Sequence, residues 1–354
     1  MISALLAHII LMMNRYRLFF LAVMVPVFFV SGCGAPKAGN PTRTRYRQSR
    51  MTLGTVVHVD VCLDKEAINS VEDVYEKVWA GMDQVYRTMS PRLVSSDVWK
   101  VNHSYPDPVE VHAATYQVIK RALKLSRRTN GAFDITVKPL MDLWQAAQEQ
   151  NRLPDETMIR KKIAAVGPMK IRLLDGQRVQ LAHPESQIDL GGIAKGYAID
   201  QAAAVLREAG WPDFYIDAGG DIYVAGHNCR GRSWRIGVRH PRKPDRIIDT
   251  LVLSDSAVTT SGDYERFFSI GQHRWSHIIY PLTGYPARDI VSATVIAPDA
   301  TTADALSTAL CVLAPDRGLG LIDSWNENFA ALITQESPQG RIRVRPSRRY
   351  PNFK

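Results

Sequence analysis

The order of strand-like and helix-like stretches limits the folds open to this chain more than any other feature. Residues 55–63 alternate with apolar side chains on one face, which predicts a β-strand. Residues 68–89 and 112–128 repeat apolar side chains at the spacing of amphipathic helices. Because strands and helices then interleave without a regular βαβ period, we expect a single compact α+β domain with mixed or antiparallel sheets flanked by helices. Helices are also predicted at 192–210 and 301–313, and strands at 169–174, 178–182, 186–190, 213–217, 221–225, 233–239, 249–253, 274–279, 290–296, 329–334 and 341–345.

The first 32 residues have the parts of an export signal. Arg15 and Arg17 precede an apolar run over residues 18–30, which is too short to span a bilayer comfortably. The tripeptide that ends at Cys33, Ser-Gly-Cys, resembles a bacterial lipobox, in which the cysteine is lipidated and becomes the first residue. We therefore expect a lipoprotein signal peptide over residues 1–32. An ordinary signal anchor with an incidental cysteine is the alternative, and a start at Met13 would give a more conventional signal.

Residues 33–50 are polar, basic and rich in Pro, Gly and Thr, which predicts a tether between lipidated Cys33 and a folded domain over residues 51–354. Several acyl chains on one cysteine would anchor the protein stably. By resemblance to lipoprotein sorting rules, Gly34 in place of Asp favours the outer membrane. We expect a membrane-anchored lipoprotein that faces the periplasm of a bacterium, with either the inner or the outer membrane as its support.

The positive charge of the chain lies at its two ends. The whole chain carries a net charge of +9, whereas residues 51–339 carry −4, because 1–32, 33–50 and 340–354 contain two, five and six basic residues and no acidic ones. Such tails fit a solvated linker and an edge strand, or else an attraction to anionic lipid near the anchor. Since the body has no basic motif with interleaved aromatic residues, we expect no nucleic-acid partner.

Besides Cys33 the chain has three cysteines, and none forms a CxxC or Cys/His metal pattern. Cys62 and Cys311 stand in apolar runs, which predicts buried thiols, and Cys229 stands in a polar loop. The odd number predicts no disulfide framework.

Two motifs suggest chemistry on a phosphate ester. Residues 189–196 form a glycine-rich turn that carries Lys195 and opens a predicted helix, a pattern that suits phosphate but also fits a simple strand-to-helix turn. Asp304 and Thr308 stand four residues apart, so on a helix they share one face. Their oxygens suit Mg²⁺, although Asp304 is also favoured by the helix dipole after Thr hydroxyls suited to an N-cap.

Four further stretches are polar at places where chain turns are expected. Asp134, within Gly-Ala-Phe-Asp-Ile-Thr at 131–136, either caps a turn or contacts a ligand. The stretch Asp-Ala-Gly-Gly-Asp at 217–221 reads as a tight turn whose acids are structural or line the same site. Residues 259–266 gather hydroxyls, acids and an arginine in a turn. His277 follows among Ser, Thr and Gly residues and is either structural or an acid/base group.

In their joint order these stretches resemble the ApbE family, the FAD:protein FMN transferases. The matching stretches are 131–136, 189–200, 217–221, 260–266, 276–279 and 301–310. The resemblance implies an enzyme that cleaves the pyrophosphate of FAD, moves FMN onto a Ser or Thr hydroxyl of a target protein and releases AMP. It also implies that the acceptors are flavoprotein subunits of membrane electron-transport complexes, such as ion-pumping quinone reductases.

The same resemblance assigns roles to individual residues. Asp304, Thr308 and the backbone carbonyl of Gly192 would bind Mg²⁺, and His277 would be the base for the incoming hydroxyl. The residues expected to contact FAD are Leu53, Met89, Ala132, Phe133, Asp134, Asp189, Lys195, His277 and Ile278. The chain departs from the family pattern at Tyr280, where an Asp is usual, at Leu53, where Met is usual, and at Met89, in a region that often has Tyr.

Two other functions are open to a chain with these motifs. Water in place of the protein hydroxyl would make it an FAD hydrolase that forms FMN and AMP. A non-catalytic lipoprotein that binds FAD belongs to a different class, and Tyr280 is the feature that suggests it. Phosphoryl transfer itself needs an in-line nucleophile and neutralised oxygens, which the predicted Mg²⁺ and His277 would supply.

Overall fold

A computed structural model describes residues 43–64, 70–326 and 328–353, all within one compact unit, Gly39–Lys354. The predicted signal peptide, Cys33 and the first part of the tether lie outside the described residues. Within the described ranges, no helix combines the length and the apolar character that a membrane crossing requires.

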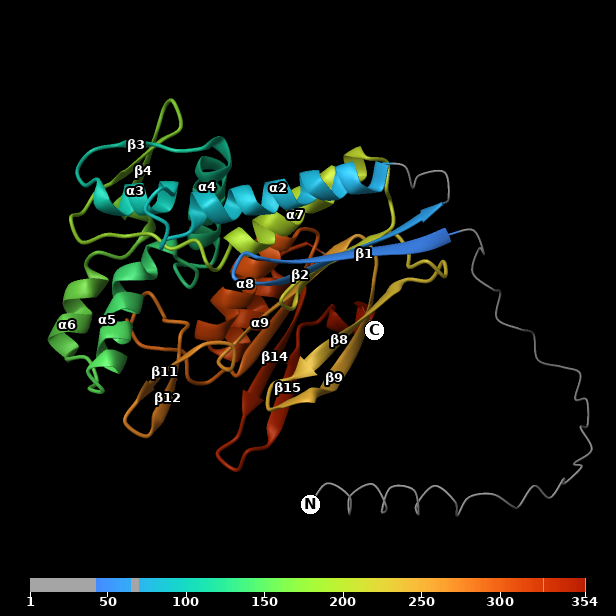
Figure 1. Cartoon of the computed structure of the whole chain (residues 1–354). Helices are drawn as coiled ribbons and strands as arrows, with labels where there is room; N and C mark the ends of the chain where they lie inside the picture. The colour runs from blue at the N-terminus through green and yellow to red at the C-terminus, as the bar shows by residue number, and fades with distance from the viewer. Residues whose placement is uncertain (1–42, 65–69, 327, 354) are drawn as a thin grey trace, which may run out of the picture. The chain divides into compact units, whose positions relative to one another are not determined.

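An eight-stranded sheet forms the centre of the domain (Figure 1). Each strand pairs with its neighbours in antiparallel fashion. All six residues of β13 are buried, because helices cover one face of the sheet and a smaller sheet covers the other. The expected α+β fold with antiparallel sheets is therefore confirmed. In spatial order the strands are β1 (Arg43–Thr52), β2 (Thr55–Asp64), β6 (Phe214–Ala218), β7 (Asp221–Ala225), β10 (Ser256–Gly262), β13 (Ser292–Ala297), β14 (Ala330–Glu336) and β15 (Ile342–Pro346).

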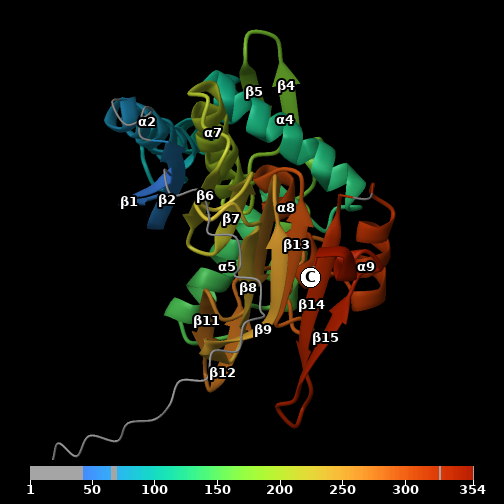
Figure 2. The same cartoon turned by 90° about the vertical axis from the view of Figure 1, so that its right-hand side faces the viewer.

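Helices α2 (Val71–Met89) and α7 (Ala194–Glu208) lie side by side, and α7 also packs against α8 (Ala300–Val312) (Figures 1 and 2). Helix α8 packs on β10 and β13 and is buried over nearly its whole length. Helix α9 (Pro315–Asp323) packs beside it against β14. This arrangement places the N-terminal halves of α7 and α8 next to each other.

The remaining elements form smaller units around this body. Strands β3 (Val109–Glu110), β5 and β4 make a three-stranded sheet, and β8 pairs with β9, and β11 with β12. A separate apolar cluster joins α5 and α6 to the β11–β12 hairpin. The other bounds are α3 (Asp97–His103), α4 (Ala113–Arg128), η2 (Ile135–Val137), α5 (Lys138–Glu149), α6 (Glu156–Ile163), η3 (Pro168–Lys170), β4 (Ile171–Leu174), β5 (Arg178–Leu181), β8 (Trp234–His240), β9 (Lys243–Leu253), β11 (Phe267–Ile270), β12 (His273–Ser276) and η4 (Tyr350–Phe353).

The strand expected at 186–190 does not form. The side chain of Asn102 takes the place of a neighbouring strand there: its Nδ2 donates to the Ile188 carbonyl at 2.9 Å, and its Oδ1 accepts from the Ile188 N–H at 2.7 Å. Conversely, the first part of the turn expected at 259–266 belongs to strand β10, whose polar sequence is half-buried between β7 and β13. Strand β12 ends at Ser276, before the predicted limit.

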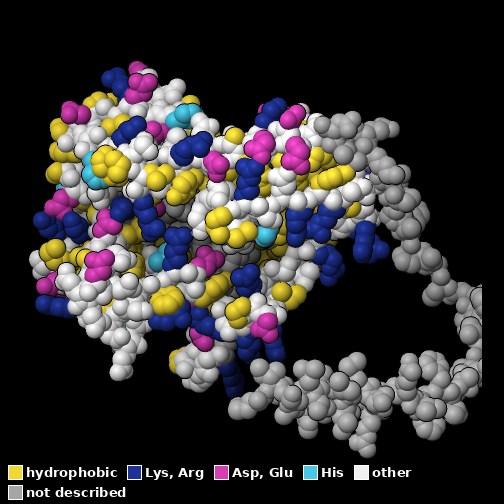
Figure 3. Space-filling model, viewed as in Figure 1, with side chains coloured by type: hydrophobic (Ala, Val, Ile, Leu, Met, Phe, Trp, Pro, Cys, Tyr) yellow, Lys and Arg dark blue, Asp and Glu magenta, His cyan; other side chains and the backbone are white. Residues whose placement is uncertain are grey.

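The predicted tether is wrong over residues 43–50, which belong to strand β1. Arg45 and Arg47 each reach the buried carboxylate of Asp60 on β2 at 2.5 Å, and Arg43 pairs with Asp213 at 2.5 Å. Residues 43–50 therefore belong to the folded domain, because long-range ion pairs neutralise the charges that made this stretch look solvated. Figure 3 shows Lys and Arg side chains gathered on the surface where β1 lies.

The two basic ends of the folded chain, β1 and β15, are the two edges of the eight-stranded sheet. The edge-strand interpretation of the C-terminal tail is thus confirmed, and it extends to residues 43–50. Charged side chains on edge strands discourage pairing with other chains.

Cys62 and Cys229 form a disulfide, with 5.1 Å between their Cα atoms, so the expectation of no disulfide was wrong for this pair. The bond joins β2 to the loop after β7 across 167 residues of sequence. Counting cysteines reveals their parity but not which of them the fold brings together. Cys311 is a buried free thiol, as predicted.

Candidate functional site

The site is built where α7 meets α8. A Cβ atom on Gly196 would lie 2.2 Å from the Ala300 carbonyl oxygen and 2.9 Å from the Asp304 Cβ, so only glycine allows this approach. The Gly196 N–H donates to the Asp304 carboxylate at 2.9 Å. The glycine-rich turn predicted from the sequence thus brings the start of α7 onto the predicted metal ligand of α8.

The N-terminus of α8 is capped by carboxylates from outside the helix. Asp299 accepts from the Thr302 N–H at 2.7 Å, and Asp200 accepts from the Ala300 N–H at 2.8 Å. The expected capping by the Thr hydroxyls is therefore wrong. Asp304 is the fifth residue of the helix, beyond the first turn, so the helix dipole does not account for a carboxylate there.

Lys195 lies among buried carboxylates. Its Nζ forms an ion pair with Asp221 at 2.6 Å, and only 3% of Asp221 is exposed. Burial alone would lower the pKa of Lys195, but the negative charges of Asp221 and Asp304 outweigh burial and raise that pKa. Burial and the charge of Asp221 in turn raise the pKa of Asp304, against the opposite influence of Lys195. Asp221, the second acid of the Gly-Gly turn, thus belongs to the site. Asp217, the first, accepts from the Gly220 N–H at 2.8 Å and stabilises the turn.

The three predicted metal ligands lie on adjacent segments of the fold, and their chemistry fits Mg²⁺. The Thr308 hydroxyl donates to the Asp304 carbonyl at 3.2 Å, one turn along the helix. A Cβ on Gly192 would lie 3.2 Å from the Thr308 Oγ1, so this backbone passes directly over the hydroxyl. A carboxylate, a hydroxyl and a carbonyl oxygen are hard ligands, and Mg²⁺ is typically bound by one or two carboxylates together with waters and substrate phosphates. No group of three or more His, Cys, Asp or Glu side chains placed to bind a metal occurs in the described ranges.

Two serines that sequence reasoning did not single out complete this cluster. The Ser261 hydroxyl, on β10, lies 2.8 Å from that of Ser307 and 3.3 Å from that of Thr308. Ser261 therefore helps to orient the Thr308 hydroxyl. Its position within the matching stretch 260–266 could have pointed to Ser261 in the sequence. The contact between the two hydroxyls, however, depends on the packing of β10 against α8.

The stretch 131–136 contributes packing and a cap. Phe133 stands against Gly192, since a Cβ there would lie 3.3 Å from its ring. Asp134 is buried and accepts from the Thr136 N–H at 2.8 Å and from the Ser126 hydroxyl at 3.2 Å, and burial raises its pKa. These contacts agree with the interpretation of Asp134 as a cap of the turn. Ala132 is also buried, beside Phe133.

The neighbouring turn is held in the same way. The Asp189 N–H donates to the Ile135 carbonyl at 2.8 Å, and the Asp189 carboxylate accepts from the Gly191 N–H at 2.7 Å. Burial raises the pKa of this carboxyl group. These bonds join the stretch 131–136 to the glycine-rich turn, so both belong to one rim of the site.

Two of the predicted flavin contacts lie in other surroundings. Met89 ends α2 and is 3% exposed within the main apolar core, which leaves little of its side chain for a ligand. Leu53 occupies the turn between β1 and β2 with a positive φ of 54° and packs partly against the same core.

His277 follows β12 and is oriented by the backbone. Its Nδ1 lies 2.8 Å from the Arg266 carbonyl oxygen. Because a carbonyl can only accept, Nδ1 carries the proton and Nε2 keeps its lone pair. Burial, with the positive charges of Arg266 and Lys195, lowers the pKa of His277. The imidazole is therefore neutral at pH 7 and able to accept a proton. Ile278 beside it is buried, and its N–H donates to the Ser276 hydroxyl at 3.1 Å.

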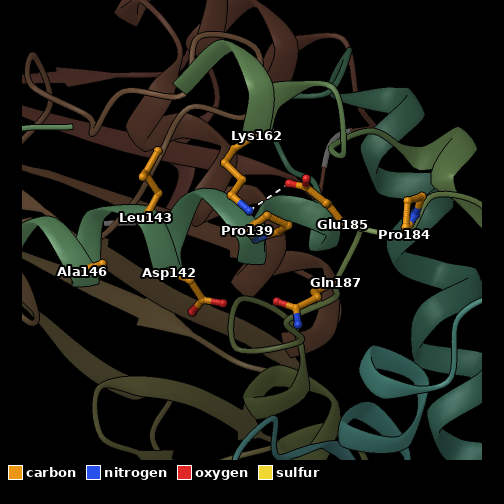
Figure 4. Close-up of a pocket in the computed structure, with 8 residues that line it drawn as sticks. All are labelled: Pro139, Asp142, Leu143, Ala146, Lys162, Pro184, Glu185 and Gln187. Carbon is orange, nitrogen blue, oxygen red and sulfur yellow. Dashed lines mark hydrogen bonds and ion pairs between the residues drawn. The ribbon is translucent and has the colours of Figure 1, made fainter. Parts of the chain in front are cut away.

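A cavity of about 320 Å³ lies apart from this cluster, between α5, α6 and the segment 184–187 (Figure 4). Its Lys162 and Glu185 form an ion pair at 2.9 Å. None of the residues predicted from the sequence lines it. The lining residues are Pro139, Asp142, Leu143, Ala146, Lys162, Pro184, Glu185 and Gln187.

Comparison with known proteins places this arrangement among flavin transferases. The FAD:protein FMN transferase of Haemophilus influenzae is 32% identical over 304 residues, which cover 83% of this chain and 87% of that protein. The FAD:protein FMN transferase of Vibrio cholerae is 29% identical over 311 residues, covering 86% and 90%.

Solved structures agree with these relatives. The crystal structure of the ApbE protein from Thermotoga maritima superposes with a TM-score of 0.78 at 35% identity, over 88% of this chain and 99% of that one. The flavin transferase ApbE from Vibrio cholerae superposes with a TM-score of 0.77 at 28% identity, over 88% and 100%. A model of the ApbE family matches residues 53–333, and the chain therefore belongs to the ApbE family.

Proposed function

We propose that this protein is an Mg²⁺-dependent FAD:protein FMN transferase. The observation that carries the proposal is the convergence of Gly192, Lys195, Asp221, Asp304 and Thr308 where α7 meets α8. It combines hard oxygen ligands with a buried cation, the two features that a pyrophosphate substrate needs. The related proteins that are named for this reaction support it.

The reaction is a substitution at phosphorus. The acceptor's Ser or Thr oxygen attacks the phosphorus on the FMN side of the FAD pyrophosphate, and the bond from that phosphorus to the bridging oxygen breaks. FMN becomes a phosphodiester on the acceptor, and AMP leaves with the bridging oxygen. Nε2 of His277 accepts the proton of the attacking hydroxyl, a contribution of about 10²–10⁴-fold in general base catalysis.

The other residues act on charge and position. Gly192, Asp304 and Thr308 would hold Mg²⁺, which when bound neutralises phosphate oxygens and polarises the phosphorus. Lys195 adds a positive charge whose position is set by its ion pair with Asp221. Ser261 keeps the Thr308 hydroxyl in place. Tyr280 supplies no carboxylate, and His277 is oriented by the contact of its Nδ1 with the Arg266 carbonyl oxygen.

We also propose that the protein is a lipoprotein, anchored at Cys33 and facing the periplasm, with acceptors among flavoprotein subunits of membrane electron-transport complexes. The Cys62–Cys229 disulfide supports export, because disulfides persist in oxidising compartments. A chain of ten residues from Cys33 to Arg43 reaches at most roughly 35 Å, which would keep the domain near membrane-bound acceptors.

One incubation tests the proposed reaction against its alternatives. The mature protein is mixed with FAD, Mg²⁺ and membrane proteins from cells that lack this gene. Flavin fluorescence that stays on a denatured protein band, with release of AMP, supports the transferase. AMP without a labelled protein indicates hydrolysis of FAD, and bound but intact FAD indicates a carrier. Mass spectrometry of the labelled band then identifies the acceptor and its FMN-bearing residue.

A further inference from the structure

The hairpin formed by β11 and β12 projects from the body beside α5 and leads directly into His277 (Figures 1 and 2). Among the described strands, these two pair only with each other, so each has an outer edge. Ser269 lies opposite Arg274, and His277 donates its N–H to the Arg266 carbonyl at 3.4 Å. Because neighbouring residues of a strand point their backbone groups to opposite sides, those of Ser269, Arg274 and Ser276 face outward.

The two outer edges differ. On β11, the Ser269 N–H donates to the Gln148 side chain at 2.6 Å, and the Gly271 N–H in the turn donates to Asn151 at 2.7 Å. The end of α5 and the residue that follows thus close this edge. On β12, the outward N–H and carbonyl groups of Arg274, which is exposed, have no hydrogen-bond partner in the part of the chain that the structure describes, whereas Ser276 further along is only 6% exposed. An edge of this kind is a template for an additional strand.

The open edge continues a ladder that already exists. Beyond His277, the same side of the chain is paired: the Ile278 carbonyl accepts from the Ala287 N–H at 2.8 Å, and the Tyr280 N–H donates to the Tyr285 carbonyl at 2.8 Å. After Ala287 this partner segment leads to β13, and no hydrogen bond within the described ranges pairs the outward backbone groups of exposed Arg274. A strand laid there would extend the ladder past His277.

The charges around this edge favour an acidic partner. Arg266, Arg274 and Arg288 are exposed, and none of them has an ion pair with a described carboxylate. The guanidinium groups of Arg274 and Arg288 instead lie over the rings of Phe267 and Trp275, at 3.7 and 4.3 Å. Three unpaired arginines beside one short strand give complementarity to carboxylates on an incoming peptide.

We propose that the acceptor protein binds as an extended segment along the outer edge of β12, with acidic residues near its Ser or Thr, so that the hydroxyl is delivered to His277. This inference rests on the proposed transferase function and specifies how its protein substrate is recognised. Backbone pairing supplies affinity for an extended peptide, and the arginines select its charge.

The test compares two proline variants at facing positions of the hairpin. Arg274→Pro removes the outward N–H of the open edge and places a ring there, while Ser269→Pro makes the same change at the closed edge. The probe is a synthetic peptide with the sequence around the FMN-bearing residue that mass spectrometry of the labelled acceptor identifies. We expect Arg274→Pro to raise the peptide KM about tenfold or more, and Ser269→Pro to leave it within about twofold, with FAD affinity unchanged in both.

A peptide KM that is unchanged in Arg274→Pro, or raised equally by both prolines, overturns the proposal. Hydrogen exchange on the wild-type protein supplies a readout that is independent of variant folding: the peptide slows exchange at the Arg274 amide, and unchanged exchange there contradicts edge pairing. A peptide KM that does not rise with salt would show that acidic residues of the segment do not contribute to binding.

A wild-type dimer that Arg274→Pro dissociates would show that a second copy occupies this edge. Failure of the transferase proposal itself is seen separately, as wild-type protein that binds FAD but labels no acceptor.

Discussion

At the scale of single residues, the site contains two buried carboxylates whose burial is unfavourable for stability. Asp221 and Asp304 are both almost fully buried, and burial raises the pKa of each. One lysine ion pair offsets only part of this cost. A folded protein accepts such an arrangement where function requires it, so the two carboxylates are better explained by a cation and a phosphate substrate than by stability.

Replacing Asp304 separates its effect on catalysis from its effect on stability. In Asp304→Asn the amide keeps the size of the side chain and an oxygen for the Gly196 N–H, but it removes the buried negative charge. We expect FMN transfer to fall by about 10²-fold or more, in line with losses seen when charge stabilisation at a reacting centre is removed. Thermal unfolding should occur at the same or a higher temperature. A variant that keeps full activity, or a wild-type enzyme active in EDTA, would exclude Mg²⁺ held by Asp304.

The pH dependence of the reaction follows from His277. Burial lowers its pKa below the usual value of 6.5, so the neutral base persists to a lower pH than it would in solution. We expect kcat/KM for the acceptor to fall on the acid side with a midpoint below 6.5. His277→Gln should lower kcat and abolish this fall in kcat/KM at acid pH, while FAD binding is retained. A midpoint above the usual value, or the same fall in the variant, would assign the titration to another group.

At the scale of elements, the contact between α7 and α8 decides the geometry of the site. Two helix backbones touch at Gly196, and the turn before α7 lies over Thr308. The spacing of these helices therefore controls the distance between the phosphate-binding turn and the metal ligands.

Gly196→Ala tests this control against Gly81→Ala on α2. An alanine at 196 would collide with the Ala300 carbonyl, whereas a Cβ at 81 meets no atom within 4 Å. We expect Gly196→Ala to lower the free energy of unfolding by about 1–3 kcal/mol and to reduce FAD affinity and turnover. Gly81→Ala should raise it by about 0.5–1 kcal/mol without a change in activity. Urea unfolding and FAD titration measure both; equal behaviour of the two variants would rule out close packing as the role of Gly196.

At the scale of the whole molecule, the Cys62–Cys229 bond closes a loop of 167 residues that includes the glycine-rich turn and the Gly-Gly turn of the site. It fastens the edge region of the large sheet, where β1 also pairs through Arg43 with Asp213. The described part of the domain that is closest in sequence to Cys33 is thus held by covalent and ionic contacts.

Reduction of this disulfide should destabilise the domain. A native disulfide typically contributes about 2–4 kcal/mol through its constraint on the unfolded chain, so dithiothreitol should lower the midpoint of urea unfolding by a corresponding amount. The double variant Cys62→Ser, Cys229→Ser should show the lowered midpoint without reductant and no further response to it. A wild-type midpoint that does not respond to dithiothreitol would show that the bond makes no contribution to stability.

Local patterns in the sequence determined several features of this protein: the amphipathic helices, most strands of the large sheet, the shared face of Asp304 and Thr308, and the motif order that identified the family. Such patterns arise among residues a few positions apart, where backbone geometry alone decides which side chains are neighbours. Only the tertiary structure decided that Lys195 pairs with Asp221, that Ser261 reaches Thr308, that Cys62 bonds to Cys229, and that arginines on β1 enclose Asp60. These partners are separated by between 13 and 167 residues, and their meeting depends on how sheets and helices pack.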